Sequence, residues 1–405
     1  MNILFLTLSK MEDIREKGIY TDLVRELAKK GLNIYVVFPR EKRTGLPTEL
    51  VVKENMKFLK VSTGNITKTS FIEKGVSTLL IERQYLKSIK NHLGDIRFDL
   101  VMYSTPPITF GRIINYFKRK HGSKTYLVLK DIFPQNAVDI NILKKGSFIW
   151  RYFRYKEKKL YKASDVIGCM SEGNVKYVLD HNHFIDKHKV EIFPNSIEPV
   201  ELKENGDRKL FEKYQVPIHS TLFVYGGNLG KPQGIDFLLK IADQFHQVEG
   251  GHLFIVGSGT EYDKIRIHLE THSPRNVTLV KELPKEEYDQ LLNIADVGLI
   301  FLDNRFTIPN FPSRLVSYME YSLPVLAATD ANTDLKDVLL NSKCGLWSES
   351  GDLELFLSNA KKLCEDEDFR KKMGRNGRKF LEENFDIRKN VKIILKHLQM
   401  MKGAT

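Results

Sequence analysis

The sequence predicts an α/β protein with two Rossmann-like parallel sheets, one in each half of the chain. Three observations lead to this prediction. At 405 residues the chain is longer than one ordinary core requires, so two domains are expected. Short apolar runs alternate with segments of helical spacing, which is the pattern of strand–helix–strand units. The alternation stops at a weaker, polar segment, 194–206, and then begins again.

The first half opens on an apolar strand, a polar loop and an amphipathic helix that ends at Gly31. We expect its strands at 1–9, 33–39, 57–61, 99–103, 125–129, 165–169 and 190–193. Helices are expected at 18–30, 85–93 and 108–120. The basic, uneven stretch 64–86 is predicted to contain a mobile loop.

The second half repeats the alternation, with strands expected at 221–225, 252–256, 277–280, 297–301 and 324–327 and a helix at 235–245. After Asp366 the chain is expected to be almost wholly helical, at 370–384 and 387–401. A terminal helix of this length can cross back onto the first domain. The predicted domains are therefore 1–198 and 199–380, followed by a C-terminal helix, 381–405.

The net charge of +12 favours an anionic partner, which could be a nucleotide, a membrane surface or nucleic acid. The distribution of the charge along the chain helps to choose among these partners. Residues 141–162 hold eight Lys or Arg and one acid, interleaved with aromatic residues. Such a segment is suited to an anionic bilayer surface, with rings at the headgroup level and basic side chains on phosphates. The alternative is an ordinary basic helix that packs its aromatic face on the protein.

No apolar run approaches the length of about 20 residues that spans a bilayer, and the first nine residues are typical of a strand rather than a signal peptide. We therefore expect a cytoplasmic protein. Its three cysteines are far apart and lack metal-ligand spacing, so reduced thiols are expected. The histidines of 181–188 and the acids of 366–368 are interpreted as a polar loop and a solvated helix start. Metal-dependent chemistry has no positive support.

The segment 306–325 is the most informative part of the chain, because it predicts a seat for a phosphate. Pro309 and Pro312 keep the preceding residues extended and leave Ser313 and Arg314 at a helix start, where backbone N–H groups point outward. Arg314 adds a fixed positive fork. The alternative is that Pro312 and Ser313 merely begin a surface helix.

Other candidate residues follow predicted strands, where open α/β sheets bind their ligands. The turn 226–234 is rich in glycine and opens a helix, although it matches neither a Walker A loop nor a dinucleotide fingerprint. Residues 257–259 and 303–314 follow two further strands, so three turns are expected to face one cleft. Asp131 directly follows the strand 125–129, where it would orient a hydroxyl, or cap the next turn.

Three segments together resemble the family 4 retaining glycosyltransferases of the GT-B fold: 227–234, 130–135 and, most specifically, 305–319. The likeness covers essentially the whole chain. It is strongest to bacterial enzymes of capsule and O-antigen assembly that look like N-acetylfucosaminyl transferases. The resemblance implies two Rossmann-like domains facing a cleft, with a nucleotide-sugar donor on the second domain and an acceptor on the first.

The resemblance also implies roles for single residues. The diphosphate would lie against Gly227, Asn228 and the Ser313–Arg314 helix start, the base by Lys281 and Glu282, and the acceptor near Gly18, Ser104 and Asp131. The implied catalytic residues are Asp131 and Arg314, and the implied donor-binding residues are Gly18, Gly227, Asn228, Gln233, Lys281, Glu282, Asn310, Phe311, Ser313, Arg314, Ser317 and Glu320. No metal and no cofactor beyond the UDP-linked sugar donor are expected.

The chain departs from the wider family at several positions. Two Glu eight residues apart are replaced by Pro309 and Ser317, and an Arg and a Lys that grip the diphosphate are replaced by Asn228 and Gln233. Glu320 lies three residues beyond Ser317 and therefore on nearly the same helix face, so we expect it to restore the ribose contact.

The expected reaction moves a sugar, such as an N-acetylated 6-deoxyhexosamine, to a lipid-linked saccharide acceptor with retention of configuration. The expected place is the inner face of a bacterial cell membrane, at an anionic lipid surface. A GT-B-fold sugar-nucleotide epimerase is the alternative enzyme, and it usually carries catalytic carboxylates and His that are missing from these motifs. A nucleic-acid-binding protein would use the basic excess, but its signature motifs are missing, so no nucleic acid is expected.

Overall fold

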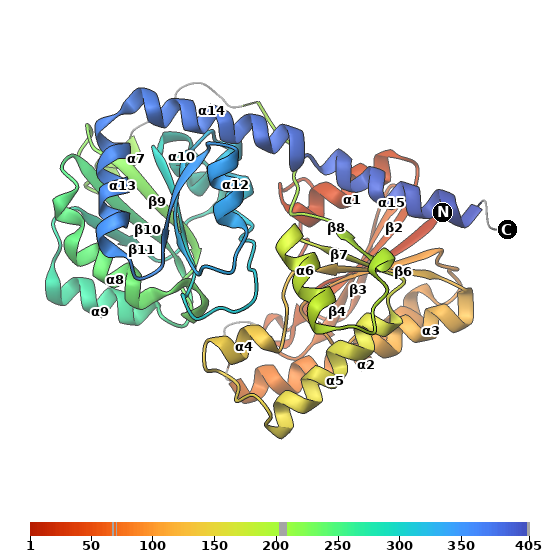
Figure 1. Ribbon diagram of the computed structural model, residues 1–405. Helices are drawn as coiled ribbons and strands as arrows, with labels where there is room; N and C mark the ends of the chain where they lie inside the picture. Colours follow the sequence, from red (N-terminus) through yellow and green to blue (C-terminus); the bar gives the residue numbers. More distant parts are fainter. Residues whose placement is uncertain (67–68, 70, 202–208, 403–405) are drawn as a thin grey trace. The chain divides into compact units, whose positions relative to one another are not determined.

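The computed structural model describes residues 1–66, 69, 71–201 and 209–402, and these form two compact units (Figure 1). The first unit comprises Met1–Glu198 and Asp386–Thr405, and the second comprises Pro199–Phe385. Within the predicted polar segment 194–206, residues 202–206 lie outside the described residues, as do residues 67, 68 and 70 of the predicted loop 64–86.

The first unit is built on an eight-stranded sheet of order β3-β4-β2-β1-β5-β6-β7-β8. All neighbouring strands are parallel except β3 and β4, which are antiparallel. The strands are β1 (Asn2–Leu6), β2 (Asn33–Glu41), β3 (Glu49–Lys53), β4 (Met56–Thr63), β5 (Leu100–Ser104), β6 (Lys124–Leu129), β7 (Val166–Cys169) and β8 (Val190–Ile192). The helices are α1 (Ile19–Lys29), α2 (Phe71–Leu93), α3 (Gly111–His121), α4 (Gln135–Asp139), α5 (Phe148–Ala163), α6 (Glu172–His181) and α15 (Ile387–Lys402).

Helices cover both faces of this sheet, with α2, α3 and α5 on one face and α1 and α15 on the other (Figure 1). The helix expected at 85–93 is longer than predicted, because α2 begins at Phe71; the loop expected within 64–86 falls on residues 64–70, of which 67, 68 and 70 lie outside the described residues. The buried residues Ile81, Tyr85 and Ile89 of α2 recur every fourth position and pack on the sheet. Exposed Leu79 and Leu80 beside this stripe obscured the helical period in the sequence.

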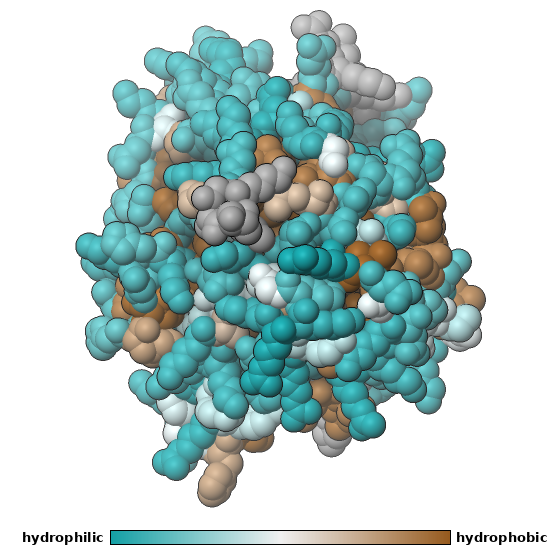
Figure 2. Space-filling model, turned by 90° about the vertical axis from the view of Figure 1, so that its right-hand side faces the viewer, coloured by the Kyte–Doolittle hydropathy of each residue, from teal (hydrophilic) through white to brown (hydrophobic). Residues whose placement is uncertain are grey.

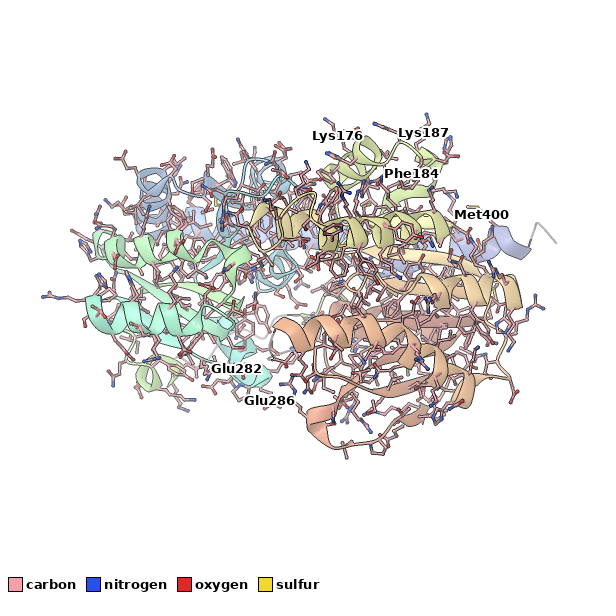
Figure 3. The ribbon with its side chains drawn as sticks, turned by 90° about the horizontal axis from the view of Figure 1, so that it is seen from below. Lys176, Phe184, Lys187, Glu282, Glu286 and Met400 are labelled. Carbon is pink, nitrogen blue, oxygen red and sulfur yellow. The ribbon has the colours of Figure 1, made fainter. Side chains whose placement is uncertain are left out.

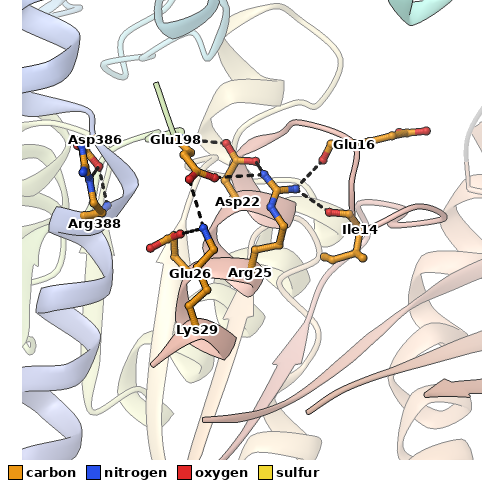
Figure 4. Close-up of polar contacts among 9 residues, drawn as sticks. All are labelled: Ile14, Glu16, Asp22, Arg25, Glu26, Lys29, Glu198, Asp386 and Arg388. Atoms are coloured by element: carbon orange, nitrogen blue, oxygen red, sulfur yellow. Dashed lines mark hydrogen bonds and ion pairs between the residues drawn. The ribbon is translucent and has the colours of Figure 1, made fainter. Parts of the chain in front are cut away.

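Helix α1 is anchored by a buried acid and its partners (Figure 4). Asp22 is fully buried, pairs with Arg25 at 2.5 Å, and accepts a hydrogen bond from the backbone N–H of Glu198 at 2.9 Å. Arg25 also donates to the carbonyl of Ile14 at 2.6 Å. These bonds hold two segments against α1: the loop before it, at Ile14, and the end of the segment 1–198, at Glu198.

The C-terminal helix returns to the first unit, as predicted. Helix α14 (Glu367–Asn384) belongs to the second unit, and α15 begins two residues after Phe385 and packs on α1. The N–H of Ile387 donates to the carbonyl of Ile197 at 2.9 Å, and Asn390 donates to that of Pro194 at 2.8 Å. The units therefore change at residue 386 rather than at the predicted 381, because α14 continues to Asn384 while packed on α11.

The second unit holds a six-stranded parallel sheet of order β11-β10-β9-β12-β13-β14. Its strands are β9 (Thr221–Asn228), β10 (Gly251–Ser258), β11 (Val277–Val280), β12 (Val297–Phe301), β13 (Val325–Thr329) and β14 (Gly345–Glu349). Its other helices are α7 (Lys209–Lys213), α8 (Ile235–Gln244), α9 (Tyr262–His272), α10 (Lys285–Ile294), α11 (Arg314–Glu320), α12 (Leu335–Asn341) and α13 (Leu353–Glu365). Apolar side chains of β9, β10, β12 and α8 form one continuous core, which fixes the strand ends.

Hydrophilic side chains cover most of the face seen in Figure 2, and apolar side chains form small separate patches on it. Among the described residues, no helix combines the length and the apolar character that a bilayer crossing requires. The three cysteines are unpaired thiols, of which Cys169 and Cys344 are buried.

Candidate functional site

Strands β9 and β10 of the second unit stay paired to their carboxyl ends. The two strands pair as far as Gly227 with Gly257 and Asn228 with Ser258. A Cβ on Gly257 would lie 1.8 Å from the carbonyl oxygen of Gly227, so only glycine fits there. Residues 226–228 thus belong to the strand, and the predicted turn is shorter, formed by the 3₁₀ turn Lys231–Gln233 before α8.

Arg314 reaches this strand end from the first position of helix α11. Its guanidinium carbon lies 4.5 Å from the centre of the Tyr225 ring, within the range of a cation–π contact. Its Nη2 lies 2.9 Å from the place that a Cβ on Gly227 would occupy. Gly227 has a φ of 133°, which also favours glycine. The missing side chain at residue 227 therefore makes room for the guanidinium.

Three tyrosines that the sequence analysis missed form the wall behind this arginine. Tyr318 on α11 donates to the carbonyl of Val224 at 3.1 Å and accepts from the N–H of Gly226 at 3.3 Å. A Cβ on Gly226 would overlap the ring of Tyr288, whose pKa burial raises to about 12. With Tyr225, these rings surround the guanidinium with apolar and hydroxyl groups, which restricts its orientation.

Asn228 and Gln233 are held to each other. The side-chain amide of Asn228 donates to Oε1 of Gln233 at 2.9 Å, and the N–H of Gly230 donates to the same oxygen at 3.2 Å. Asn228 is exposed at the strand end. These two neutral side chains therefore order the glycine turn, and they add no positive charge to that of Arg314.

The loop before α11 presents one buried donor. The carbonyl of Asn310 accepts from the hydroxyl of Thr333 at 2.5 Å, whereas its buried Nδ2 has no hydrogen-bond partner among the described residues. A buried unpaired amide is costly, so it is a reasonable place for a ligand oxygen. Phe311 packs edge-on against Phe385, and Arg305 is engaged in an ion pair with Asp303 at 2.7 Å.

Ser313 is exposed and precedes α11 without a side-chain capping bond. The helix has only seven residues, so its dipole is a weaker source of positive potential than the sequence suggested. Arg314 and the glycine strand end therefore carry the argument for an anion site here.

Glu320, the predicted ribose ligand, is buried and is held by a backbone group. It ends α11, is 5% exposed, and its Oε1 accepts from the backbone N–H of Val200 at 3.3 Å. This burial and this backbone partner leave the predicted ribose contact a prediction, which the Glu320→Ala variant tests. Ser317, one turn after Arg314, is half-buried on the same helix.

Lys281 and Glu282 follow strand β11, the edge strand beside β10. Val256 of β10 pairs with Val280 of β11, so Lys281 lies next to Gly257 along the sheet edge. Its Nζ is 5.6 Å from the Tyr262 ring. Both residues are exposed, and Figure 3 labels Glu282 with Glu286 of α10. Lys281 and Glu282 thus follow a strand that is separated from Gly227 on β9 by strand β10.

In the first unit, Asp131 follows β6 as expected. Its backbone N–H and that of Lys130 both donate to Oγ1 of Thr105, at 3.2 and 2.9 Å. Burial raises the pKa of Asp131 to about 6, against the opposing charge of Lys130. Burial lowers the pKa of Lys130 to about 7. A carboxyl that titrates near neutrality at a strand end is a candidate functional group.

Gly18 and Ser104 also lie at strand or helix ends of the first unit. Gly18 precedes α1 in an extended conformation, and its N–H donates to Asp22 at 3.2 Å. Ser104 is buried at the end of β5 and donates to Thr7 at 3.1 Å. The side chain of Lys130, which the sequence analysis passed over, lies 5.4 Å from the Tyr20 ring and donates to Asn195.

The comparisons with known families match both halves of the chain. Residues 19–201 match the model described as Glycosyltransferase Family 4, and residues 207–380 match the one described as Glycosyl transferases group 1. The chain belongs to the family 4 glycosyltransferases. Both models describe transferases, so the epimerase alternative has no support.

Individual relatives of this glycosyltransferase are distant. It is 24% identical to the probable glycosyltransferase WbjE of Pseudomonas aeruginosa, over 69% of each chain. It is 26% identical to CapM of Staphylococcus aureus, a capsular polysaccharide biosynthesis glycosyltransferase, over 60% of this chain and 63% of CapM. The chain thus spans about two thirds of the length of these relatives.

Solved structures of the same fold cover the glycosyltransferase from end to end. Sucrose-phosphate synthase of Thermosynechococcus elongatus has a TM-score of 0.78 at 15% identity, with all of both chains covered. HepE of Anabaena in complex with UDP has a TM-score of 0.69 at 13% identity, covering 99% of this chain and 100% of HepE. The predicted GT-B fold is confirmed.

The transferase also has a group of exposed aromatic and apolar side chains on α5. Phe148, Ile149, Tyr155 and Tyr152 are 90, 57, 53 and 41% exposed. Phe153 instead packs on Phe133, with ring centres 4.9 Å apart. The alternative that the helix packs its aromatic face on the protein therefore applies to only part of that face.

Proposed function

We propose that this glycosyltransferase moves a sugar from a UDP-linked donor to a lipid-linked saccharide acceptor, with retention of anomeric configuration, in capsule or O-antigen biosynthesis. The observation that carries the proposal is Arg314, which is clamped over Tyr225 and beside Gly227 at the carboxyl end of a central strand. That arrangement suits a donor diphosphate, because the Arg314 guanidinium supplies positive charge and the backbone at Gly227, which has no side chain, can be approached closely by phosphate oxygens. The second unit is thus the proposed donor-binding unit, and the first receives the acceptor.

In the proposed reaction the bond between the anomeric carbon and the diphosphate breaks, and the acceptor oxygen bonds to that carbon on the same face. Negative charge grows on the departing diphosphate, where Arg314 stabilises it. The departing phosphate oxygen takes the acceptor proton, so no side-chain base is needed. The buried Asn310 amide is placed to donate to the donor as well.

Asp131 is the proposed orienting group for acceptor or sugar hydroxyls. Its backbone is fixed by Thr105, and among the described residues no hydrogen bond holds its carboxylate. An ionised carboxylate accepts hydrogen bonds from hydroxyls, which positions the attacking oxygen.

The choice of UDP is supported by the resemblance of the sequence and by the UDP complex of HepE, which shares the fold. The place in polysaccharide assembly is supported by the name of CapM. An N-acetylated 6-deoxyhexosamine, such as FucNAc, is the proposed sugar on the sequence resemblance alone.

A thermal-shift panel of UDP-, GDP- and dTDP-sugars tests the donor proposal, because a ligand that binds only the folded protein raises its melting temperature. We expect a response to UDP-sugars that Arg314→Ala abolishes while the unliganded protein still melts cooperatively. A full response in the variant would contradict the site, and a response to GDP-sugars alone would contradict the nucleotide.

We also propose that the protein acts at the inner face of a bacterial cell membrane, with α5 on anionic lipid. The exposed Phe148 and Ile149 stand beside Lys144, Lys145 and Arg151, which are also exposed. Exposed apolar side chains next to basic ones are typical of an interfacial helix.

Flotation with phosphatidylglycerol vesicles at low salt tests this surface. Phe148→Ser with Ile149→Ser is expected to reduce vesicle binding. A matched control, Leu46→Ser with Val52→Ser, removes two other exposed apolar side chains of the same unit and is expected to bind normally. Equal binding of both double variants would refute the role of α5.

A further inference from the structure

A polar cluster on the second unit lies at the ends of two helices that the proposed reaction does not use. Asp243 is near the end of α8, and His268 and His272 are in the last two turns of α9. A helix that follows a parallel strand runs back along the sheet, so these helix ends lie at the edge opposite the strand ends of the donor site. The cluster is therefore separate from Arg314 and Gly227.

The three side chains offer ligand atoms that all lie within 4.8 Å of one another. Nε2 of His268 is 2.8 Å from Oδ1 of Asp243. The two imidazole rings are stacked, with centres 4.0 Å apart and an angle of 18° between their planes. Ligands of a tetrahedral zinc ion stand about 3.3 Å apart, as bond lengths near 2 Å require. Small side-chain rotations therefore bring the three atoms to that spacing.

The hydrogen bond of His272 to the backbone selects the ring tautomer that a metal needs. Its Nδ1 is 2.9 Å from the backbone oxygen of His268, and a carbonyl only accepts, so Nδ1 carries the proton. In the neutral ring the Nε2 atom then has a lone pair for a metal. His272 is exposed, which leaves a path for the ion and for a water ligand.

The surrounding charges suit a cation. Both helix ends carry the negative end of the helix dipole, and Asp243 adds a carboxylate. Two imidazoles and one carboxylate favour Zn²⁺ or a similar transition metal, because Mg²⁺ and Ca²⁺ prefer oxygen ligands throughout.

We propose that Asp243, His268 and His272 form a surface binding site for Zn²⁺ that links α8 to α9. On binding, His268 gives up the Nε2 proton that it shares with Asp243, either to its own Nδ1 or to solvent. The ion takes Oδ1 of Asp243, one nitrogen from each histidine, and water. Because both helices pack on the core of the second unit, the ion stabilises that unit and takes no part in sugar transfer.

Calorimetric titration of the full, tag-free chain with Zn²⁺ tests the site, with Mg²⁺ as the comparison ion. We expect one Zn²⁺ per chain, a rise in melting temperature, and no response to Mg²⁺. His272→Ala and Asp243→Asn should each weaken Zn²⁺ binding by at least about tenfold. Both residues are partly or fully exposed, so neither change should prevent folding.

His219→Ala is the matched control, because it removes another exposed histidine of the same unit. It should bind Zn²⁺ like the unchanged chain. Equal affinity in His272→Ala and His219→Ala, or no binding at all, would overturn the proposal. The response to UDP-sugars is expected to be the same in His272→Ala as in the unchanged chain, so failure of the metal site and failure of the donor site are told apart.

Discussion

Nη2 of Arg314 lies 2.9 Å from the point where a Cβ on Gly227 would stand. The guanidinium thus packs against the position of the missing side chain, and its carbon lies 4.5 Å from the centre of the Tyr225 ring. A lysine has no planar group for this slot, and a larger residue at 227 has no room. The glycine and the arginine are therefore one feature of the site, although 87 positions separate them in the sequence (314 minus 227).

Gly227→Ala tests that feature. The added methyl group would displace the Arg314 guanidinium, and the φ of 133° would add backbone strain. We expect kcat to fall by about a hundredfold, similar to the loss of one donor to a developing charge. The thermal-shift response to UDP-sugars should weaken with it.

Gly351→Ala is the control that separates the two effects of Gly227→Ala, the steric contact with Arg314 and the backbone strain. Gly351 has a φ of 121° in the same unit, and an added Cβ would meet no atom closer than 3.9 Å. This control should lose stability through strain and keep its kcat. Equal kcat losses in the two variants would show that the Arg314 contact is irrelevant.

Glu320→Ala is expected to affect folding rather than donor binding. The change leaves the Val200 N–H without its acceptor and should lower the free energy of unfolding by about 1–2 kcal/mol. Urea unfolding measures this loss, and titration with a UDP-sugar should give an unchanged Kd. Ser317→Ala on the same helix is the control for stability. A weakened Kd with normal stability would confirm Glu320 as the ribose ligand.

Asp131 predicts a pH dependence of activity. Burial raises its pKa to about 6, so the carboxylate forms as the pH rises through that value. If the ionised form orients the acceptor, kcat/KM increases with pH up to a plateau above about pH 7. Asp131→Asn should lower kcat by about a hundredfold and flatten this acidic limb. An unchanged limb in the variant would assign it to another group.

Strands with clear apolar runs were predictable to the residue, as β11 and β12 show. Each is a short, mostly apolar run that follows a polar residue, so the local pattern contains the answer. Strand β14 was missed, because Gly345, Ser348 and Glu349 leave it only two large apolar residues. Helix α2 was predicted to begin at 85 instead of 71, because packing on the sheet, which the local pattern does not reveal, selects its buried face.

The candidate site was predictable only where the role of a residue follows from its local sequence. Gly227 and Arg314 were found because glycine at a strand end and arginine at a helix start have local causes. Tyr225 was missed because a tyrosine in an apolar run is typical of a core, and Tyr288 and Tyr318 were missed because only the fold brings these helical residues beside Arg314. The hydrogen bond that Glu320 accepts comes from Val200, which lies far away in the sequence, so no local pattern shows it.

His252 makes the stability of the second unit dependent on pH. It is 3% exposed on β10, with Nε2 2.8 Å from the hydroxyl of Thr278, and burial lowers its pKa from 6.5 to about 4. Between these two values the unfolded chain binds a proton that the folded chain does not. Protonation therefore favours the unfolded state as the pH falls. The contribution of neutral His252 to the free energy of unfolding is complete above about pH 6.5 and is lost progressively toward pH 4.

Urea unfolding at about pH 7.5 and pH 5 measures this effect, and the expected loss from His252 alone is about 2 kcal/mol. Trp347 on β14 reports the second unit selectively once Trp150, the other tryptophan, is replaced by Phe. His252→Leu in that background should reduce the pH dependence by the same amount, because other titrating groups contribute equally to both proteins. An identical pH dependence with and without His252 would mean that the folded protein tolerates the charged imidazole.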